Sequence, residues 1–512
     1  MMGENLIIWY RDKMKREWKI AFFSAFLVCL LVHIYKFTNT LPNHDSVYNI
    51  YSTQNITGSG RWFLQYVCGI SSYFDLPWLN GLLSAVYLGL TAVIVTELLD
   101  IKNPVVIILS SAILAASPST TETVFFGYTV DGYMLGLTMG ALAALLSCKN
   151  PSVRKSVFSA VLLSLTCAVY QAYLSFAILL CAAYLVLHLM NPDFTVKKAW
   201  GWIGRHVVIY TAALASYYVV WKIALRAMDV QAVGYQGIDQ VGHIGISTLV
   251  HGAIDSVSNL FYFLFEWNIF KFPISTYAAI NVIFVLCFIG ILVAALKKSN
   301  AGKEFGRLAT ILLVLLACVP MISIWEFTSD TVFYRPMMLH SVSVFYILAL
   351  ILCNRWVKPK FSTIFGLLTA AMVFNFAVMA NISYFYLDKS YERSYYIASE
   401  IMEEIEELTL PEGGKVIKIA FIGDRGQETR LDNKYPSNQN FMMSKLLESD
   451  IISNGEHAYR FMENLFGLNL PEVTSQEQKQ LEKNPQVQNL PTWPNRDCVA
   501  VIDDTVVVRL GK

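Results

Sequence analysis

Long apolar segments separated by short polar breaks fill the first 385 residues of the chain. Most of them approach the ~20 residues that an α-helix needs to cross a bilayer. The apolar run from 156 to 190 is too long for one crossing, and the polar break at Tyr170-Gln171 predicts that it folds into an antiparallel pair. We therefore predict about eleven membrane-spanning helices, at residues 18–38, 77–98, 103–119, 130–148, 152–169, 171–190, 206–226, 275–296, 308–325, 337–353 and 361–385.

The pattern changes after the last apolar segment. Residues 388–412 are acidic with a helical period, and the hydrophobic density then falls to that of a soluble domain. Residues 415–422 are typical of a buried strand, residues 499–508 of two strands around a tight turn, and a helix is predicted near 440–448. The chain is thus predicted to be an all-α polytopic membrane protein with a small C-terminal α/β domain. The predicted parts are a transmembrane domain at 1–385, a juxtamembrane helix or linker at 386–412 and the α/β domain at 413–512.

Basic residues predict the orientation. Five of them precede or open the first span: Arg11, Lys13, Lys15, Arg16 and Lys19. Short loops rich in Lys and Arg stay in the cytoplasm. Every second loop of this chain, beginning with the N-terminal segment, is rich in these residues, and together these loops carry most of the basic residues before residue 386. The N-terminus is therefore predicted to be cytoplasmic, and an odd number of spans makes the C-terminal domain extracytoplasmic.

Composition supports a membrane protein and narrows its partners. Hydrophobic residues make up 55% of the chain and charged residues only 15%. The basic residues form short patches between apolar runs, which argues against binding of nucleic acid. The nine cysteines show no CxxC pair and no metal-ligand spacing, so we interpret them as small core residues. A disulfide between Cys68 and Cys498, both outside in this topology, stays open.

The distribution of acidic residues separates two classes of function. A transporter is expected to carry ionisable groups near the bilayer midplane, on helices interrupted there by Gly or Pro. The predicted spans carry few such groups, whereas acidic residues gather in the outer loops. This pattern favours chemistry at the outer membrane face, on a substrate whose reactive group lies at the interface.

The first outer loop carries a family resemblance. It contains Asn43-His44-Asp45 and then Gly58-Ser-Gly-Arg61-Trp62. With the pattern of spans, this loop resembles that of the membrane-bound glucosyltransferases that modify bacterial surface polysaccharide such as the O-antigen of lipopolysaccharide. These proteins resemble the wider class of C-type membrane glycosyltransferases.

The resemblance implies a reaction and a location. The donor would be a hexose, glucose by resemblance, on a polyprenyl phosphate, and the acceptor a cell-surface polysaccharide or glycolipid. The chain would lie in a bacterial plasma membrane, among its lipids, with an acidic residue of the first outer loop as the catalytic candidate. A lipid-linked oligosaccharide flippase or transporter, or the same fold acting on another acceptor, remains the alternative.

The chemistry of such a transfer selects residues. A sugar hydroxyl is a weak nucleophile, so a carboxylate that accepts its proton is expected, and Asp45 is the candidate base. The leaving lipid phosphate needs a fixed donor, and Arg61 and Arg335 are the candidates because arginine matches phosphate with paired donors. Alternatively, Asp45 is a turn or helix cap, and the arginines anchor lipid headgroups.

Three more residues are candidates for substrate binding. Asp131 is interpreted either as a contact to sugar or metal, or as an acid favoured by the helix dipole at the start of a span. Trp62 and Tyr173 lie at predicted outer boundaries, where they either stack on sugar rings or belong to the aromatic belt. No metal-ligand set is evident in the sequence, and a requirement for a divalent cation such as Mg²⁺ or Mn²⁺ stays open.

Overall fold

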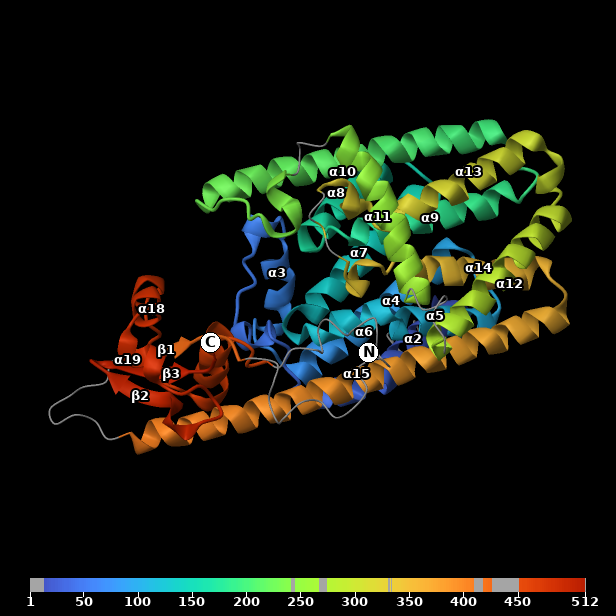
Figure 1. The fold of residues 1–512 in the computed structure, drawn as a ribbon. Helices are drawn as coiled ribbons and strands as arrows, with labels where there is room; N and C mark the ends of the chain where they lie inside the picture. The colour runs from blue at the N-terminus through green and yellow to red at the C-terminus, as the bar shows by residue number, and fades with distance from the viewer. Residues whose placement is uncertain are drawn as a thin grey trace, which may run out of the picture. The chain divides into compact units, whose positions relative to one another are not determined.

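The computed structural model describes residues 13–240, 245–266, 274–329, 332, 334–408, 418–425 and 451–511 (Figure 1). Its contacts divide the chain into two compact units. The first unit comprises Met1–Thr38, Thr53–Val124 and Thr129–Asn381, and the second comprises Asn39–Ser52, Phe125–Tyr128 and Ile382–Lys512.

The first unit is a bundle of helices. Their bounds are α2 (Arg16–Thr38), α3 (Leu64–Cys68), α4 (Pro77–Leu98), α5 (Pro104–Ala116), α6 (Pro118–Phe125), α7 (Val130–Cys148), α8 (Val153–Val169), α9 (Tyr173–Leu189), α10 (Val196–Ala227), α11 (Ile246–Phe265), α12 (Thr276–Lys298), α13 (Phe305–Met321), α14 (Val342–Trp356) and α15 (Pro359–Glu407). Two of these helices, α6 and α15, continue into the second unit.

Every predicted span overlaps one of these helices, and the predicted break in the long apolar run separates α8 from α9. Among the described residues, seven helical segments are long and apolar enough to cross a membrane. Three shorter apolar helices, α9, α13 and α14, accompany them. The chain therefore has the helices of a membrane protein, while eleven crossings and their orientation stay predictions.

Local sequence signals explain where the helices begin. Pro77 opens α4 and Pro104 opens α5, positions where the missing amide hydrogen costs nothing. The side chains of Asn103, Ser152 and Thr195 cap α5, α8 and α10 by accepting backbone hydrogen bonds.

Small residues let α7 pack closely. A Cβ atom on Gly136 would lie 2.8 Å from Cγ1 of Val169, the last residue of α8. A Cβ atom on Gly132 would lie 2.8 Å from the Cys68 sulfur of α3. Such close approach of backbones is the usual basis of helix packing in membranes.

The second unit contains a small three-stranded sheet. Strand β3 (Thr505–Arg509) lies between β1 (Lys418–Ile422), to which it is parallel, and β2 (Val499–Ile502), to which it is antiparallel. Helices α17 (Gly455–Phe461), α18 (Ser475–Leu481) and α19 (Pro485–Asn489) accompany the sheet. The strands predicted at 415–422 and 499–508 are confirmed over the described residues, whereas the helix predicted at 440–448 lies outside them.

The second unit also includes part of the first outer loop. Val47 is fully buried in a core cluster with Ile397 of α15, Ile419 of β1 and Phe461 of α17. Asn464 binds the same segment by donating a hydrogen bond to the Val47 carbonyl at 2.8 Å. Residues 39–52 thus pack with the C-terminal part, although the sequence pattern grouped them with the spans.

The two cysteines considered for a disulfide are free thiols. Cys68 is buried in the first unit against Gly132, and Cys498 is buried in the core of the second unit. The juxtamembrane helix predicted from residue 386 is the continuation of α15, which runs without a break to Glu407.

Candidate functional site

The loop that carries Arg61 is held against the break between α8 and α9. The Gln171 side chain donates hydrogen bonds to the Ser59 carbonyl at 2.8 Å and to the Tyr217 hydroxyl at 3.0 Å. The Tyr217 hydroxyl in turn donates to the Gly60 carbonyl at 3.1 Å. Gly60 has a φ of +79°, and a Cβ atom there would collide with the Tyr217 hydroxyl. The polar break thus fixes the backbone next to Arg61.

Arg61 lies among three tyrosines, which we call the tyrosine cluster: Tyr133 of α7, Tyr170, which directly follows α8, and Tyr173, the first residue of α9. Its Nη1 donates to the Tyr133 hydroxyl at 3.0 Å, and its guanidinium carbon lies 4.7 Å from the centre of the Tyr170 ring. The rings of Tyr133 and Tyr173 each lie 5.1 Å from that of Tyr170. A cation over an aromatic face is stabilised electrostatically, so this arrangement orients the guanidinium of Arg61.

The second candidate arginine is paired with a buried acid. Arg335 precedes a short 3₁₀-helix (Pro336–Met338), and its Nη1 lies 3.6 Å from Oε1 of Glu122 on α6. The backbone amide of Met337 donates to Oε2 of Glu122 at 2.6 Å. Glu122 is only 1% exposed, whereas the Arg335 side chain is 20% exposed, so a buried acid holds a partly accessible arginine.

Two side chains lie between this ion pair and the tyrosine cluster. His340 packs edge-on against Tyr173, with ring centroids 5.3 Å apart. Its Nε2 is 3.1 Å from Oγ1 of Thr123, the residue that follows Glu122. The first unit therefore brings three predicted substrate-binding residues, Arg61, Tyr173 and Arg335, into one chain of contacts.

Asp131 lies in the first turn of α7, two residues before Tyr133. The carboxylate is buried, and its neighbours are the Ser71 hydroxyl, the Gly132 amide and Asp75. Burial raises the pKa of Asp75 above its usual range, although the nearby Lys36 opposes that shift. The place of Asp131 in the first turn of α7 is the one that the helix dipole favours, and it agrees with either interpretation of this residue.

Trp62 lies at the edge of a core cluster that includes Ile209 and Tyr217 of α10. Its ring contacts Phe63 edge-on, with centroids 5.9 Å apart. The side chain is only partly exposed, so packing accounts for much of its surface.

The candidate base belongs to the second unit. Asp45 precedes a 3₁₀-helix (Ser46–Tyr48) that its backbone carbonyl supports, but its side chain makes no capping hydrogen bond there. The carboxylate is 43% exposed, and its Oδ1 lies 3.5 Å from Nε2 of His44. The interpretation of Asp45 as a helix cap is thus not supported by its side-chain contacts, and the carboxylate is left accessible.

A histidine from the C-terminal part lies beside this acid. The His457 ring of α17 is 5.9 Å from the His44 ring and 5.6 Å from the Tyr48 ring. Burial and the neighbouring His44 lower the pKa of His457, while Glu456 and Asp45 oppose the shift. The environment of His457 therefore favours its neutral form.

Sequence reasoning did not select Tyr133, Tyr170, His340 or His457 as site residues. Two of them had a usable signal in the sequence: Tyr133 follows Asp131 by two residues, and Tyr170 is part of the polar break. His340 and His457 had none, because each reaches its neighbours from a distant part of the chain.

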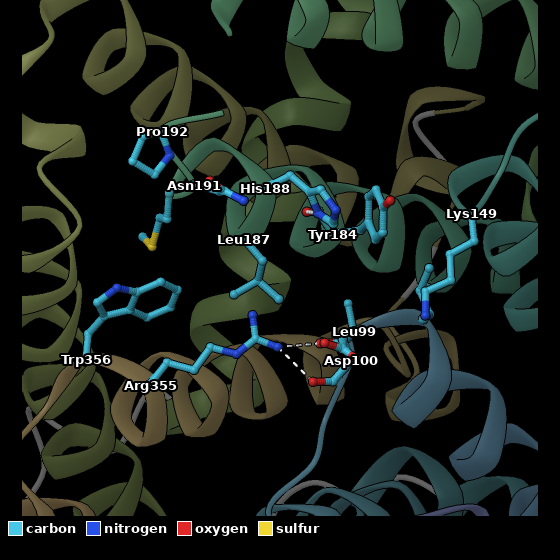
Figure 2. A pocket seen from close by; sticks show the side chains of 12 residues that line it. Leu99, Asp100, Lys149, Tyr184, Leu187, His188, Asn191, Pro192, Arg355 and Trp356 are labelled. Carbon is cyan, nitrogen blue, oxygen red and sulfur yellow. Dashed lines mark hydrogen bonds between the residues drawn. The ribbon is translucent and has the colours of Figure 1, made fainter. Parts of the chain in front are cut away.

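A cavity of about 570 Å³, lined by polar and apolar residues, lies among the C-terminal ends of α4, α7, α9 and α14 (Figure 2). Its lining includes Lys149, which follows α7, His188 of α9 and Arg355 of α14. Arg355 donates hydrogen bonds to the carbonyls of Leu99 and Asp100 at 2.8 and 2.9 Å. Lys149 pairs with Glu97 at 3.2 Å. These cations are engaged in joining helix ends, so the cavity is a weaker candidate for sugar chemistry than the surroundings of Arg61.

Comparison with known proteins identifies the family. A family described as glucosyl transferase GtrII matches residues 34–354, which is more than half of the chain and includes Asp45, Arg61, Asp131 and Arg335. No curated protein and no solved structure matches. The match confirms the resemblance seen in the first outer loop. The chain belongs to the GtrII glucosyl transferase family.

Proposed function

We propose that this protein transfers glucose from a polyprenyl phosphate carrier to a surface polysaccharide or glycolipid on the extracytoplasmic face of a bacterial plasma membrane. The observation that carries the proposal is the family match over residues 34–354. It is supported by the accessible acid in the first loop and by an arginine that aromatic rings hold in place.

In the proposed reaction, an acceptor hydroxyl oxygen attacks the anomeric carbon of the donor. Asp45 takes the hydroxyl proton as the new bond forms, an effect of roughly 10² to 10⁴ in rate. The bond between the anomeric carbon and the phosphate oxygen breaks, and the electron pair leaves with the lipid phosphate. Direct displacement of this kind inverts the anomeric centre.

We propose Arg61 as the first contact of the leaving phosphate. Its guanidinium is oriented by a hydrogen bond to Tyr133 and by the ring of Tyr170. The guanidinium of Arg335 already lies close to the Glu122 carboxylate, so a bound phosphate would share this arginine with the acid. Arg335 is accordingly the second candidate for the same role, and Asp131, Trp62 and Tyr173 are proposed to contact the sugar.

The decisive experiment measures glucose transfer from a radiolabelled polyprenyl phosphate glucose by the purified protein in detergent. Asp45→Asn is expected to lower the rate at least 100-fold at an equal yield of folded protein, because the amide cannot accept the proton. Asp229→Asn is the matched control, since Asp229 is an exposed acid outside the proposed machinery.

Full activity of Asp45→Asn would remove Asp45 from the mechanism. If the native chain moved a lipid-linked sugar between leaflets of a vesicle, without forming a new glycosidic bond, the transporter alternative would replace the proposal.

A further inference from the structure

Three metal-ligating side chains meet at the far end of α7. Cys148 ends α7, Cys181 lies within α9 and His206 lies within α10. Their ligand atoms all lie within 4.8 Å of one another, and all three residues are buried. Among the described residues, this is the one group of three or more His, Cys, Asp and Glu side chains close enough to hold an ion.

The distances match a tetrahedral site. The two sulfurs are 3.6 Å apart, and the Cys148 sulfur is 3.8 Å from Nε2 of His206. With Zn–S bonds of about 2.3 Å and Zn–N bonds of about 2.0 Å, tetrahedral angles place neighbouring ligand atoms roughly 3.5–3.8 Å apart. The sulfur separation is also far longer than the ~2.05 Å of a disulfide bond.

The histidine is oriented for coordination. Its Nδ1 lies 2.9 Å from the carbonyl oxygen of Trp202, one helical turn earlier. A carbonyl can only accept, so Nδ1 carries the proton, and Nε2 presents its lone pair toward the sulfurs. A backbone carbonyl bound to the second ring nitrogen is the usual support of a metal-ligating histidine.

We propose that Cys148, Cys181 and His206 bind one Zn²⁺ ion that clamps α7, α9 and α10 together. Two thiolates neutralise the charge of the ion, which reduces the cost of burying it in an apolar bundle. The Tyr210 hydroxyl, 3.5 Å from the Cys181 sulfur, lies where it or a water molecule can complete the coordination. A cavity of about 360 Å³, lined in part by Cys181, His206 and Tyr210, gives access to the site.

The clamp is separate from the candidate site for sugar transfer. Asp131 and Cys148 lie at opposite ends of α7, about 25 Å apart at 1.5 Å per residue. The ion is therefore assigned a structural role, and binding rather than transfer is the readout that tests it.

The test uses the full chain, purified in detergent with a reductant, stripped with a chelator and titrated with Co²⁺ followed by Zn²⁺. The expected result is one Co²⁺ per chain, with thiolate-to-cobalt charge-transfer absorption that Zn²⁺ abolishes. Cys148→Ser, Cys181→Ser and His206→Asn are each expected to weaken binding at least tenfold. Cys167→Ser, which changes a buried thiol of α8 outside the group, should bind as the native chain does.

Three results would overturn the proposal. The first is a native chain without charge-transfer absorption at any Co²⁺ concentration, a measurement that needs no variant to fold. The second is binding of native affinity by Cys181→Ser. The third is a Cys148–Cys181 disulfide, found by mass spectrometry in the chain purified without reductant.

Discussion

Arg61 shows how a single charged side chain is prepared for an anion. Tyr170 lies under its guanidinium and Tyr133 accepts one of its hydrogen bonds, so the plane of the group is set before any ligand arrives. A lysine would retain the charge but lose the stacking and the paired donors. The proposed contact with phosphate therefore depends on the shape of the group as well as its charge.

Arg61→Lys is expected to lower the turnover number for glucose transfer by about 10², in the range found when one donor to a developing charge is lost. The measurement is steady-state transfer at saturating donor, with folding checked by size-exclusion chromatography. Arg226→Lys is the control, since Arg226 is exposed at the end of α10. Equal turnover for Arg61→Lys and the native chain would assign the leaving-group contact to another residue.

Among the helices, the docking of α11 depends on one buried acid. The short 3₁₀-helix Ile324–Phe327 carries Glu326, whose Oε1 accepts a hydrogen bond from Asn259 of α11 at 2.7 Å. Ser256 of α11 donates to the Ser323 carbonyl at 3.0 Å. A Cβ atom on Gly252 would lie 2.6 Å from the Glu326 carbonyl oxygen. The backbone of α11 therefore lies so close to the 3₁₀-helix that only glycine fits at this position.

The protonation of Glu326 makes this contact sensitive to pH. Burial, reinforced by Asp255, raises the pKa of Glu326 from 4.5 to about 7. The folded chain then binds more protons than the unfolded chain between these values, so stability decreases as pH rises from about 4.5 to 7.

Glu326→Gln is expected to flatten this dependence and to stabilise the chain at pH 8 by at most about 3 kcal/mol, because the amide carries no charge to bury. Thermal unfolding in detergent from pH 4.5 to 8 measures the effect. Glu406→Gln, a change of an exposed acid in α15, should leave the native profile unchanged. If the stability of Glu326→Gln changed with pH as steeply as that of the native chain, another group would cause the pH dependence.

The helices were predictable from sequence because each apolar segment is long and bounded by a clear polar signal. Gln171 marked the turn between α8 and α9, and a run of three Val residues marked β3. The sequence could nominate Arg61 and Arg335 by residue type, but not Glu122 and Tyr170 as their partners. The sequence also could not group Cys148, Cys181 and His206. They lie on three different helices, and separations that long in the sequence form no recognisable motif.

At the scale of the whole molecule, the loop with Asp45 is anchored by the C-terminal part of the chain. Val47, two residues after Asp45, is fully buried in the core of the second unit. Asn464 holds its carbonyl, and His457 lies beside His44. The C-terminal part thus supports the backbone that presents the proposed base.

Val47→Ala is expected to destabilise the second unit by about 1–3 kcal/mol, the usual cost of removing buried methyl groups, and to lower transfer by loosening the Asp45 loop. Thermal unfolding and the transfer assay, run on the same preparation, measure both effects. Val153→Ala is the control, since Val153 is 81% exposed. Unchanged transfer in a destabilised Val47→Ala protein would show that the base does not depend on this anchor.

The anchoring of Val47 by Asn464 also sets an order of events during synthesis. The two residues are 417 positions apart, so at roughly 5–20 residues per second the ribosome needs tens of seconds after Val47 to deliver its partner. Until then the nascent chain holds the Asp45 loop without its support. A prematurely terminated polypeptide would insert its helices but lack the proposed base in its working position, and this would keep unfinished copies from modifying glycans.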